Sequence, residues 1–154
     1  MEKIAIVDLG SNSARLVIVN LFADGYFMVI DELKESVRLG HDMDRDGFLK
    51  PQRIAETIRT LKMFKRLCDA HKVSRIIAVG TAAVRRAKNQ RSFLDEIQAT
   101  CGMKIHVLSP EEEAIYEVSI TAVMSASPKN WLPYAYFTSA VMPSSAAAAS
   151  MPRT

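Results

Sequence analysis

Runs of β-branched and other apolar residues along the first 120 residues mark where strands are expected. Polar turn residues separate these runs, and an Asp24-Gly25 hairpin precedes the third of them. The run before Gly80 is apolar throughout, as is typical of a buried parallel strand. The pattern therefore predicts strands at 4–7, 15–22, 26–30, 75–80 and 105–108.

Apolar residues three and four positions apart predict the helices. One amphipathic helix is expected at 52–71 after Pro51, and a second at 92–101 before Gly102. Ser109-Pro110-Glu111-Glu112 predicts the start of a third helix, with Ser109 as its N-cap and Glu112 at its third position. The order β-β-β-α-β-α-β-α predicts an α/β fold: a mixed five-stranded sheet with helices on its faces, as in one ribonuclease-H-like lobe.

Charge divides the chain into two regions. All 17 acidic residues lie at or before Glu117, and 18 of the 20 Lys and Arg lie at or before Lys104. The last 33 residues hold four of the six prolines and the Trp, and show no helical or strand period. We therefore expect one domain at 1–121 and an irregular, non-native or disordered tail at 122–154. Such a tail is typical of translation in a wrong reading frame or of a truncated or chimeric gene product.

Composition narrows the cellular setting and the partners. Net charge is +3, and a nucleic-acid surface requires clustered cations rather than a total, so no nucleic-acid partner is expected. Cys68 and Cys101 have no partner at metal-ligand spacing, which favours two buried thiols in a reducing compartment. No signal segment or membrane-length apolar run is present, so we expect a cytoplasmic protein without membrane attachment.

The stretch from Asp8 to Arg15 carries the most chemical information. A strand delivers the Asp8 carboxylate to its end, where it is placed to hold Mg²⁺ directly or through water. The turn Gly10-Ser11-Asn12-Ser13 can aim backbone N–H groups and two hydroxyls at a phosphate. The alternative is a plain hairpin, because turns favour these residue types.

Two further segments follow buried strands and carry charge. Arg85, in a small-residue stretch after 75–80, is a candidate phosphate contact at a helix start. The alternative is that Arg85 lies on a solvated basic face, which is the interpretation we prefer for Arg86. Glu111-Glu112-Glu113 exceeds what capping requires, so one glutamate is a candidate general base; the alternative is a solvated acidic turn. Residues 42–48 match the first positions of an EF-hand loop, but Arg53 occupies its twelfth position, so no EF-hand is expected.

Four motifs together resemble the exopolyphosphatase/guanosine pentaphosphate phosphatase family. They are Asp8-Leu9-Gly10-Ser11-Asn12-Ser13-Ala14-Arg15-Leu16, Val37-Arg38-Leu39-Gly40, Thr81-Ala82-Ala83-Val84-Arg85-Arg86-Ala87 and Val107-Leu108-Ser109-Pro110-Glu111-Glu112-Glu113-Ala114. The resemblance covers residues 1–116. It implies the actin-like ATPase fold, two lobes around a cleft, and Mg²⁺-dependent hydrolysis of terminal phosphates from inorganic polyphosphate or guanosine pentaphosphate.

The resemblance also implies a role for each matching residue. Asp8 would hold the metal, Gly10, Ser11, Asn12 and Ser13 would bind phosphate, Arg85 would contact substrate phosphate, and Glu113 would be the general base. The family's second Asp-Ile-Gly-Gly-Gly-Ser turn is missing here, so we expect one lobe with little or no activity alone. The alternative is a fragment that binds polyphosphate without cutting it, and an exposed lobe face would allow a homodimer.

Overall fold

A mixed sheet of five strands organises the chain, as the sequence predicts. The computed structural model describes residues 1–23, 27–43 and 45–125. The sheet order is β3-β2-β1-β4-β5. Neighbours β1–β2 and β2–β3 run antiparallel, whereas β1–β4 and β4–β5 run parallel. The strands are β1 Glu2–Leu9, β2 Ser13–Leu21, β3 Phe27–Ser36, β4 Arg75–Gly80 and β5 Ile105–Val107.

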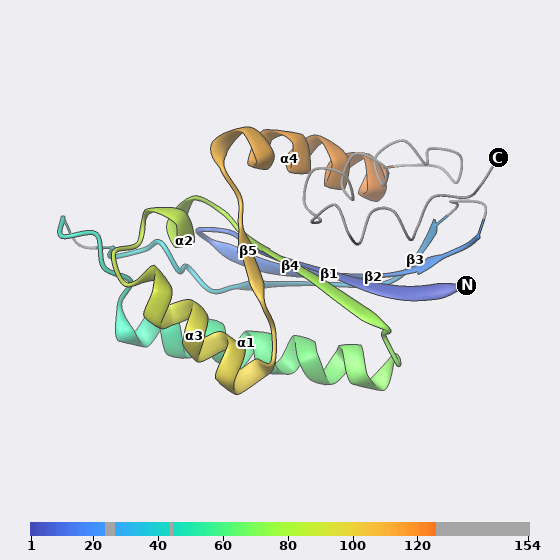
Figure 1. The fold of residues 1–154 in the computed structure, drawn as a ribbon, viewed down its shortest axis with the longest axis horizontal. Helices are drawn as coiled ribbons and strands as arrows, with labels where there is room; N and C mark the ends of the chain where they lie inside the picture. Colours follow the sequence, from blue (N-terminus) through green and yellow to red (C-terminus); the bar gives the residue numbers. More distant parts are fainter. Residues whose placement is uncertain (24–26, 44, 126–154) are drawn as a thin grey trace.

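Helices cover both faces of the sheet (Figure 1). Helices α1 Pro51–Ala70 and α3 Gln90–Cys101 lie on one face, and α4 Pro110–Ser125 lies on the other. Because strand side chains alternate between faces, Ala5, Val7 and Leu9 pack toward α1 and α3. Ile4 and Ile6 belong instead to the smaller cluster that includes Tyr116 and Ile120 of α4. The short helix α2, Ala82–Arg86, follows β4 directly.

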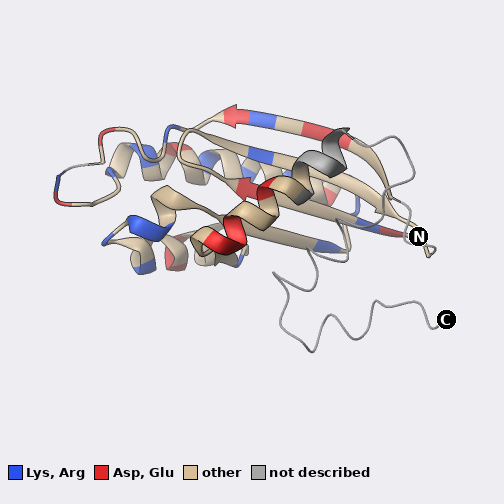
Figure 2. Ribbon diagram, turned by 90° about the horizontal axis from the view of Figure 1, so that it is seen from above, with Lys and Arg blue, Asp and Glu red and all other residues tan. Residues whose placement is uncertain are grey.

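Strand β3 differs most from its prediction. It continues to Ser36 instead of ending at 30, and its register with β2 shifts at a bulge near Ile18 and Val19. Asp31, Glu32 and Lys34 break the apolar pattern, but β3 is an edge strand, where charged side chains prevent pairing with other molecules (Figure 2). The predicted Asp24-Gly25 hairpin lies outside the described residues.

Both cysteines are free thiols in the core, as predicted. Burial raises the pKa of the Cys68 thiol to about 11, so it is a poor nucleophile at neutral pH. Over the described residues, no helix has both the length and the apolar content to cross a membrane. The predicted tail of 122–154 begins within α4, which continues to Ser125, so its first four residues are helical rather than irregular. The rest of the predicted tail, 126–154, lies outside the described residues.

The packing of α1 predicts a contrast between two adjacent side chains. Phe64 is fully buried against the sheet, whereas Met63 is 38% exposed. We expect Phe64→Ala to lower the free energy of unfolding by about 3–5 kcal/mol, through lost burial and an unfilled cavity. Met63→Ala should change it by less than about 0.5 kcal/mol. Urea unfolding of both variants measures the difference, and equal losses would contradict this packing.

Candidate active site at the carboxyl ends of three strands

Strands β1, β4 and β5 run in the same direction, so their carboxyl ends meet at one edge of the sheet. Backbone hydrogen bonds tie these ends together: Thr81 N–H donates to Leu9 O at 3.2 Å, and Leu108 N–H donates to Gly80 O at 2.9 Å. Asp8, Arg85 and Glu113 are thus brought to a common edge although over 100 residues separate the first from the last. Edges of this kind are where ligands bind in α/β sheets.

Asp8 faces the layer of α4. It continues the row of Ile4 and Ile6 along β1, and it stands opposite Arg15 of β2. Its Oδ1 atom is buried and has no hydrogen-bond partner among the described residues. Burial chiefly raises the pKa of the Asp8 carboxyl to about 6; Glu117 raises it further, Arg15 lowers it, and Glu113 adds a smaller increase. A buried carboxylate oxygen without a hydrogen-bond donor suits a cation.

The turn after β1 uses some of its polar groups internally and leaves others free. Gly10 N–H donates to Ser13 O at 3.0 Å, so this amide closes the turn and is not directed at a ligand. A Cβ on Gly10 would lie 3.2 Å from that same oxygen, which explains the glycine. Within the described residues, Ser11 N–H and Asn12 N–H donate to no other group. These two amides remain available for an anion.

The segment Val37–Gly40 holds the turn from behind. Val37 N–H and Arg38 N–H both donate to Asn12 O, at 3.0 and 2.8 Å, and Gly40 N–H donates to Ser11 O at 2.8 Å. Arg38 has a left-handed φ of 48°, which places both amides on one oxygen. The sequence motif was visible, but its supporting role was not, because backbone hydrogen bonds between distant segments leave no residue pattern.

Gly40 lies where three segments converge. A Cβ there would be 3.2 Å from the Cβ of Ser11 and 3.3 Å from the Cβ of Ala83 in α2. The turn after β1, the 37–40 segment and α2 therefore pack with no room for a methyl group. This packing sets the position of the turn relative to α2, the helix that carries Arg85.

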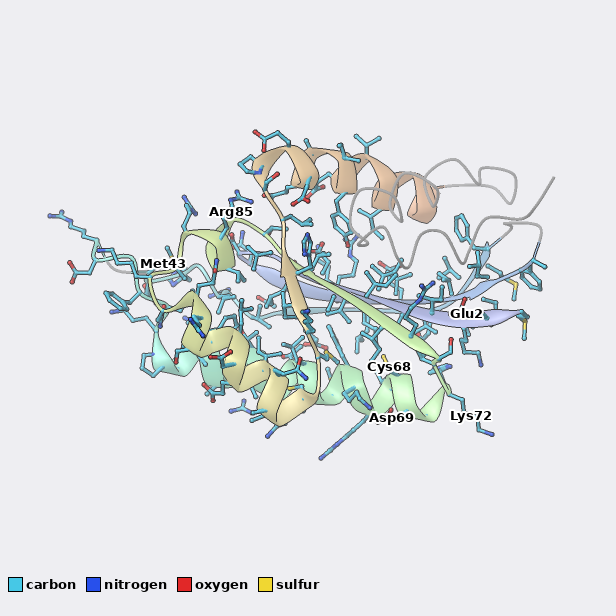
Figure 3. All side chains as sticks on the ribbon, in the orientation of Figure 1. Glu2, Met43, Cys68, Asp69, Lys72 and Arg85 are labelled. Atoms are coloured by element: carbon cyan, nitrogen blue, oxygen red, sulfur yellow. The ribbon has the colours of Figure 1, made fainter. Side chains whose placement is uncertain are left out.

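Arg85 and Glu113 bond to each other (Figure 3 labels Arg85). Arg85 Nη1 donates to Glu113 Oε2 at 2.8 Å and to Leu108 O at 2.7 Å. Their side chains are 27% and 25% exposed, so the pair is partly buried but remains accessible to solvent. Figure 2 shows the acidic first turns of α4 beside the basic end of α2. The sequence predicts both residues for the site but not their direct contact.

The three consecutive glutamates have three different environments. Glu112 forms the predicted capping box: Ser109 N–H donates to Glu112 Oε2 at 2.8 Å, and Glu112 N–H donates to Ser109 Oγ at 3.2 Å. Glu111 is exposed, and backbone and Ser109 hydrogen bonds lower its pKa. Glu113 alone of the three bonds to Arg85, and its Oε1 accepts no hydrogen bond from a described residue.

Other charged groups that the sequence singles out contribute to local structure rather than to the site. Helix α2 has five residues, so its dipole contributes little to anion binding, unlike the helix start that the sequence suggests. Arg86 is exposed and bonds back to Ala82 O. Asp42, in the segment resembling an EF-hand loop, pairs with His41 at 2.8 Å and with Arg53 at 3.6 Å, while Asp44 lies outside the described residues.

The fit of a magnesium ion rests on Asp8. Among the described residues, no group of three or more His, Cys, Asp or Glu side chains is arranged as a metal cluster. Mg²⁺ commonly takes one or two carboxylates, with waters and substrate phosphates completing its octahedron. The orphaned Asp8 Oδ1 fits such a role at this edge.

The sheet order and helix layers define the class of protein: this is a lobe of the actin-like ATPase fold. The chain belongs to the Ppx/GppA phosphatase family, whose family model matches residues 17–130. A structure of the Aquifex aeolicus Ppx/GppA family member superimposes with a TM-score of 0.72 at 39% identity, covering 79% of this chain and 39% of that one. An exopolyphosphatase from Cytophaga hutchinsonii gives a TM-score of 0.72 at 28% identity, covering 82% and 40%.

Two curated relatives have names that match this phosphatase family. A guanosine-5′-triphosphate,3′-diphosphate pyrophosphatase of Pseudoalteromonas atlantica is 39% identical over 114 residues, covering 73% of this chain and 22% of that protein. A putative exopolyphosphatase of Haemophilus influenzae is 28% identical over 114 residues, covering 74% and 35%. The chain therefore spans between about a fifth and a third of the length of these relatives.

The environment of Asp8 predicts a pH dependence of stability. Its pKa rises from 3.8 to about 6 on folding, so the folded state holds this proton more tightly than the unfolded chain. Stability from this group is full below pH 4 and is lost as pH rises through 6, at most about 3 kcal/mol. Asp8→Asn should remove this loss and raise stability at pH 7.

Urea unfolding from pH 4 to 7 in EDTA tests this dependence. The exposed Asp46→Asn variant is the control, and it should retain the wild-type pH profile. An Asp8→Asn variant that loses as much stability between pH 4 and 6 as the wild type would show that Asp8 does not titrate in this range.

Proposed function

We propose that this chain forms one lobe of an enzyme that hydrolyses terminal phosphoanhydride bonds of inorganic polyphosphate or guanosine pentaphosphate. The observation that carries the proposal is the Arg85–Glu113 pair beside the free amides of the Ser11–Asn12 turn. An anion site and a base at one strand edge are what phosphoryl transfer to water requires. The names of the relatives supply the two substrate classes.

Each group has a definite task in this proposal. Ser11 N–H, Asn12 N–H and the Arg85 guanidinium bind oxygens of the terminal phosphate. Glu113 Oε1 accepts a proton from water as the water oxygen bonds to phosphorus and the bond from phosphorus to the bridging oxygen breaks. The electron pair leaves on the bridging oxygen of the shortened chain. Asp8 would hold Mg²⁺, which when bound supplies positive charge to neutralise phosphate oxygens.

Phosphate release tests the proposal directly. Pure protein is incubated with long-chain polyphosphate or guanosine pentaphosphate and Mg²⁺, and released phosphate is measured. We expect slow release that Glu113→Gln lowers by about 100-fold or more, because a general base contributes that much. The control is Glu111→Gln, which removes an exposed carboxylate from the same helical turn.

Two results would contradict this proposal, one for the role of Glu113 and one for hydrolysis itself. Release that is unaffected by Glu113→Gln would place the base elsewhere. Binding of polyphosphate without any release, by a folded protein, would support the second candidate, a lobe that captures phosphate chains. The free turn amides favour that candidate because they bind an anion whether or not the base acts.

Gly40 provides a test of the turn itself. An alanine methyl would press on Ser11 and Ala83, so Gly40→Ala should weaken polyphosphate binding roughly tenfold by moving the turn. Gly102→Ala is the control: it strains a φ of 65° but meets no atom within 4 Å. It should lower stability by about 1 kcal/mol and leave binding unchanged. Calorimetric titration separates the two, and equal affinities would exclude the turn from the site.

A further inference from the structure

The guanidinium of Arg85 divides its donors between two directions. Its Nη1 atom carries two hydrogens, and both are used, one on Glu113 Oε2 and one on Leu108 O. Within the described residues, Nε and Nη2 donate to nothing. These two nitrogens form the parallel fork that matches two oxygens of a phosphate.

We propose that Arg85 bridges substrate and base, binding the terminal phosphate through Nε and Nη2 while Nη1 keeps Glu113 in place. Arg85 is thereby a positioning residue for Glu113 as well as a phosphate ligand. This inference rests on the proposed function of the same site. It adds that the two residues act as one unit whose geometry is set before substrate arrives.

The anchors of the pair support a rigid bridge. Arg85 comes from α2 after β4, Glu113 from α4 after β5, and Leu108 O lies at the junction between β5 and α4. Leu108 N–H also donates to Gly80 O, so Leu108, whose carbonyl oxygen accepts from Arg85, is itself hydrogen-bonded to the end of β4. With Glu113 Oε2 on Arg85, its Oε1 is the oxygen left for water. The planar guanidinium of Arg85 would then position both the terminal phosphate and the carboxylate that accepts the proton from water.

The competing arrangement is an exchange, in which phosphate displaces Glu113 from Arg85. The two arrangements predict opposite effects of neutralising Glu113. In the bridge, Glu113 orients the fork, so its loss weakens phosphate binding. In the exchange, Glu113 competes with phosphate, so its loss strengthens binding. Removing any nearby negative charge also strengthens anion binding, and this background effect requires a matched control.

Glu117 is that control. It lies one helical turn beyond Glu113 on α4, and its charge raises the pKa of the Asp8 carboxyl, which places it near the same site. No hydrogen bond or ion pair joins it to Arg85 in the described structure. Glu117→Gln therefore reports the loss of a nearby charge without the loss of the contact with Arg85.

The experiment is calorimetric binding of tripolyphosphate in EDTA to Glu113→Gln and Glu117→Gln, each with and without Arg85→Gln. We expect Glu113→Gln to bind about tenfold more weakly than Glu117→Gln. In the Arg85→Gln background the two variants should bind equally, since no bridge remains. Glu113→Asp keeps the charge but shortens the side chain, and it should also weaken binding. Circular dichroism confirms folding of every variant.

The outcomes separate this inference from the proposed function. If Arg85→Gln weakens binding while Glu113→Gln binds as tightly as Glu117→Gln or more tightly, the phosphate site stands and the bridge is wrong. If the folded wild type binds no tripolyphosphate, or Arg85→Gln leaves its affinity unchanged, both the proposed phosphate site and the bridge are wrong.

Discussion

The parallel pairing of β1 with β4 and of β4 with β5 is the constraint on which the site depends. Parallel strands require crossover connections, so successive strands all end at the same edge. Three chain segments that are far apart in sequence then begin their turns side by side. Reversing β4 would send Arg85 to the opposite end of the sheet from Asp8. The antiparallel strands β2 and β3 extend the sheet and carry the 13–36 segment back, so that Val37–Gly40 supports the first turn.

This arrangement has an electrostatic cost. Asp8 is half-buried, and Glu113 and Glu117 add negative charge to the same face, so folding works against its ionisation. Arg15 offsets part of that penalty, and Arg85 compensates Glu113 directly. Conflict between local stability and charge placement is typical of functional sites. On α1, Lys65 pairs with Asp69 at the surface, and Arg53 pairs with Glu56 in a partly buried position near the start of the helix.

Local patterns were sufficient to predict most of the fold. Apolar runs and helical spacings located all five strands and three of the helices, and Ser109 with Glu112 formed the expected capping box. The length of β3 was missed because an edge strand exposes charged residues such as Asp31 and Glu32, which resemble a loop. The five-residue helix α2 is too short to show a period.

Prediction of the site stopped at the level of single residues. Asp8, the turn and Arg85 were identified from their positions after strands, where ligand chemistry is common. Gly10 N–H bonding to Ser13 O and the support from Val37–Gly40 are backbone contacts, which residue identity does not encode. The bond between Arg85 and Glu113 depends on where α2 ends relative to α4, and this is a product of packing rather than of sequence spacing.

Helical geometry explains why the three adjacent glutamates cannot share one role. Successive residues of an α-helix point about 100° apart, so Glu111, Glu112 and Glu113 face three directions. Glu112 turns back to the cap at Ser109, and Glu111 points to solvent. The direction of Glu113 meets Arg85 because Leu108 O holds the guanidinium at the start of α4. Helix phase therefore determines which of three chemically identical side chains contacts Arg85, and Glu117, one turn further, shares that side of the helix without this contact.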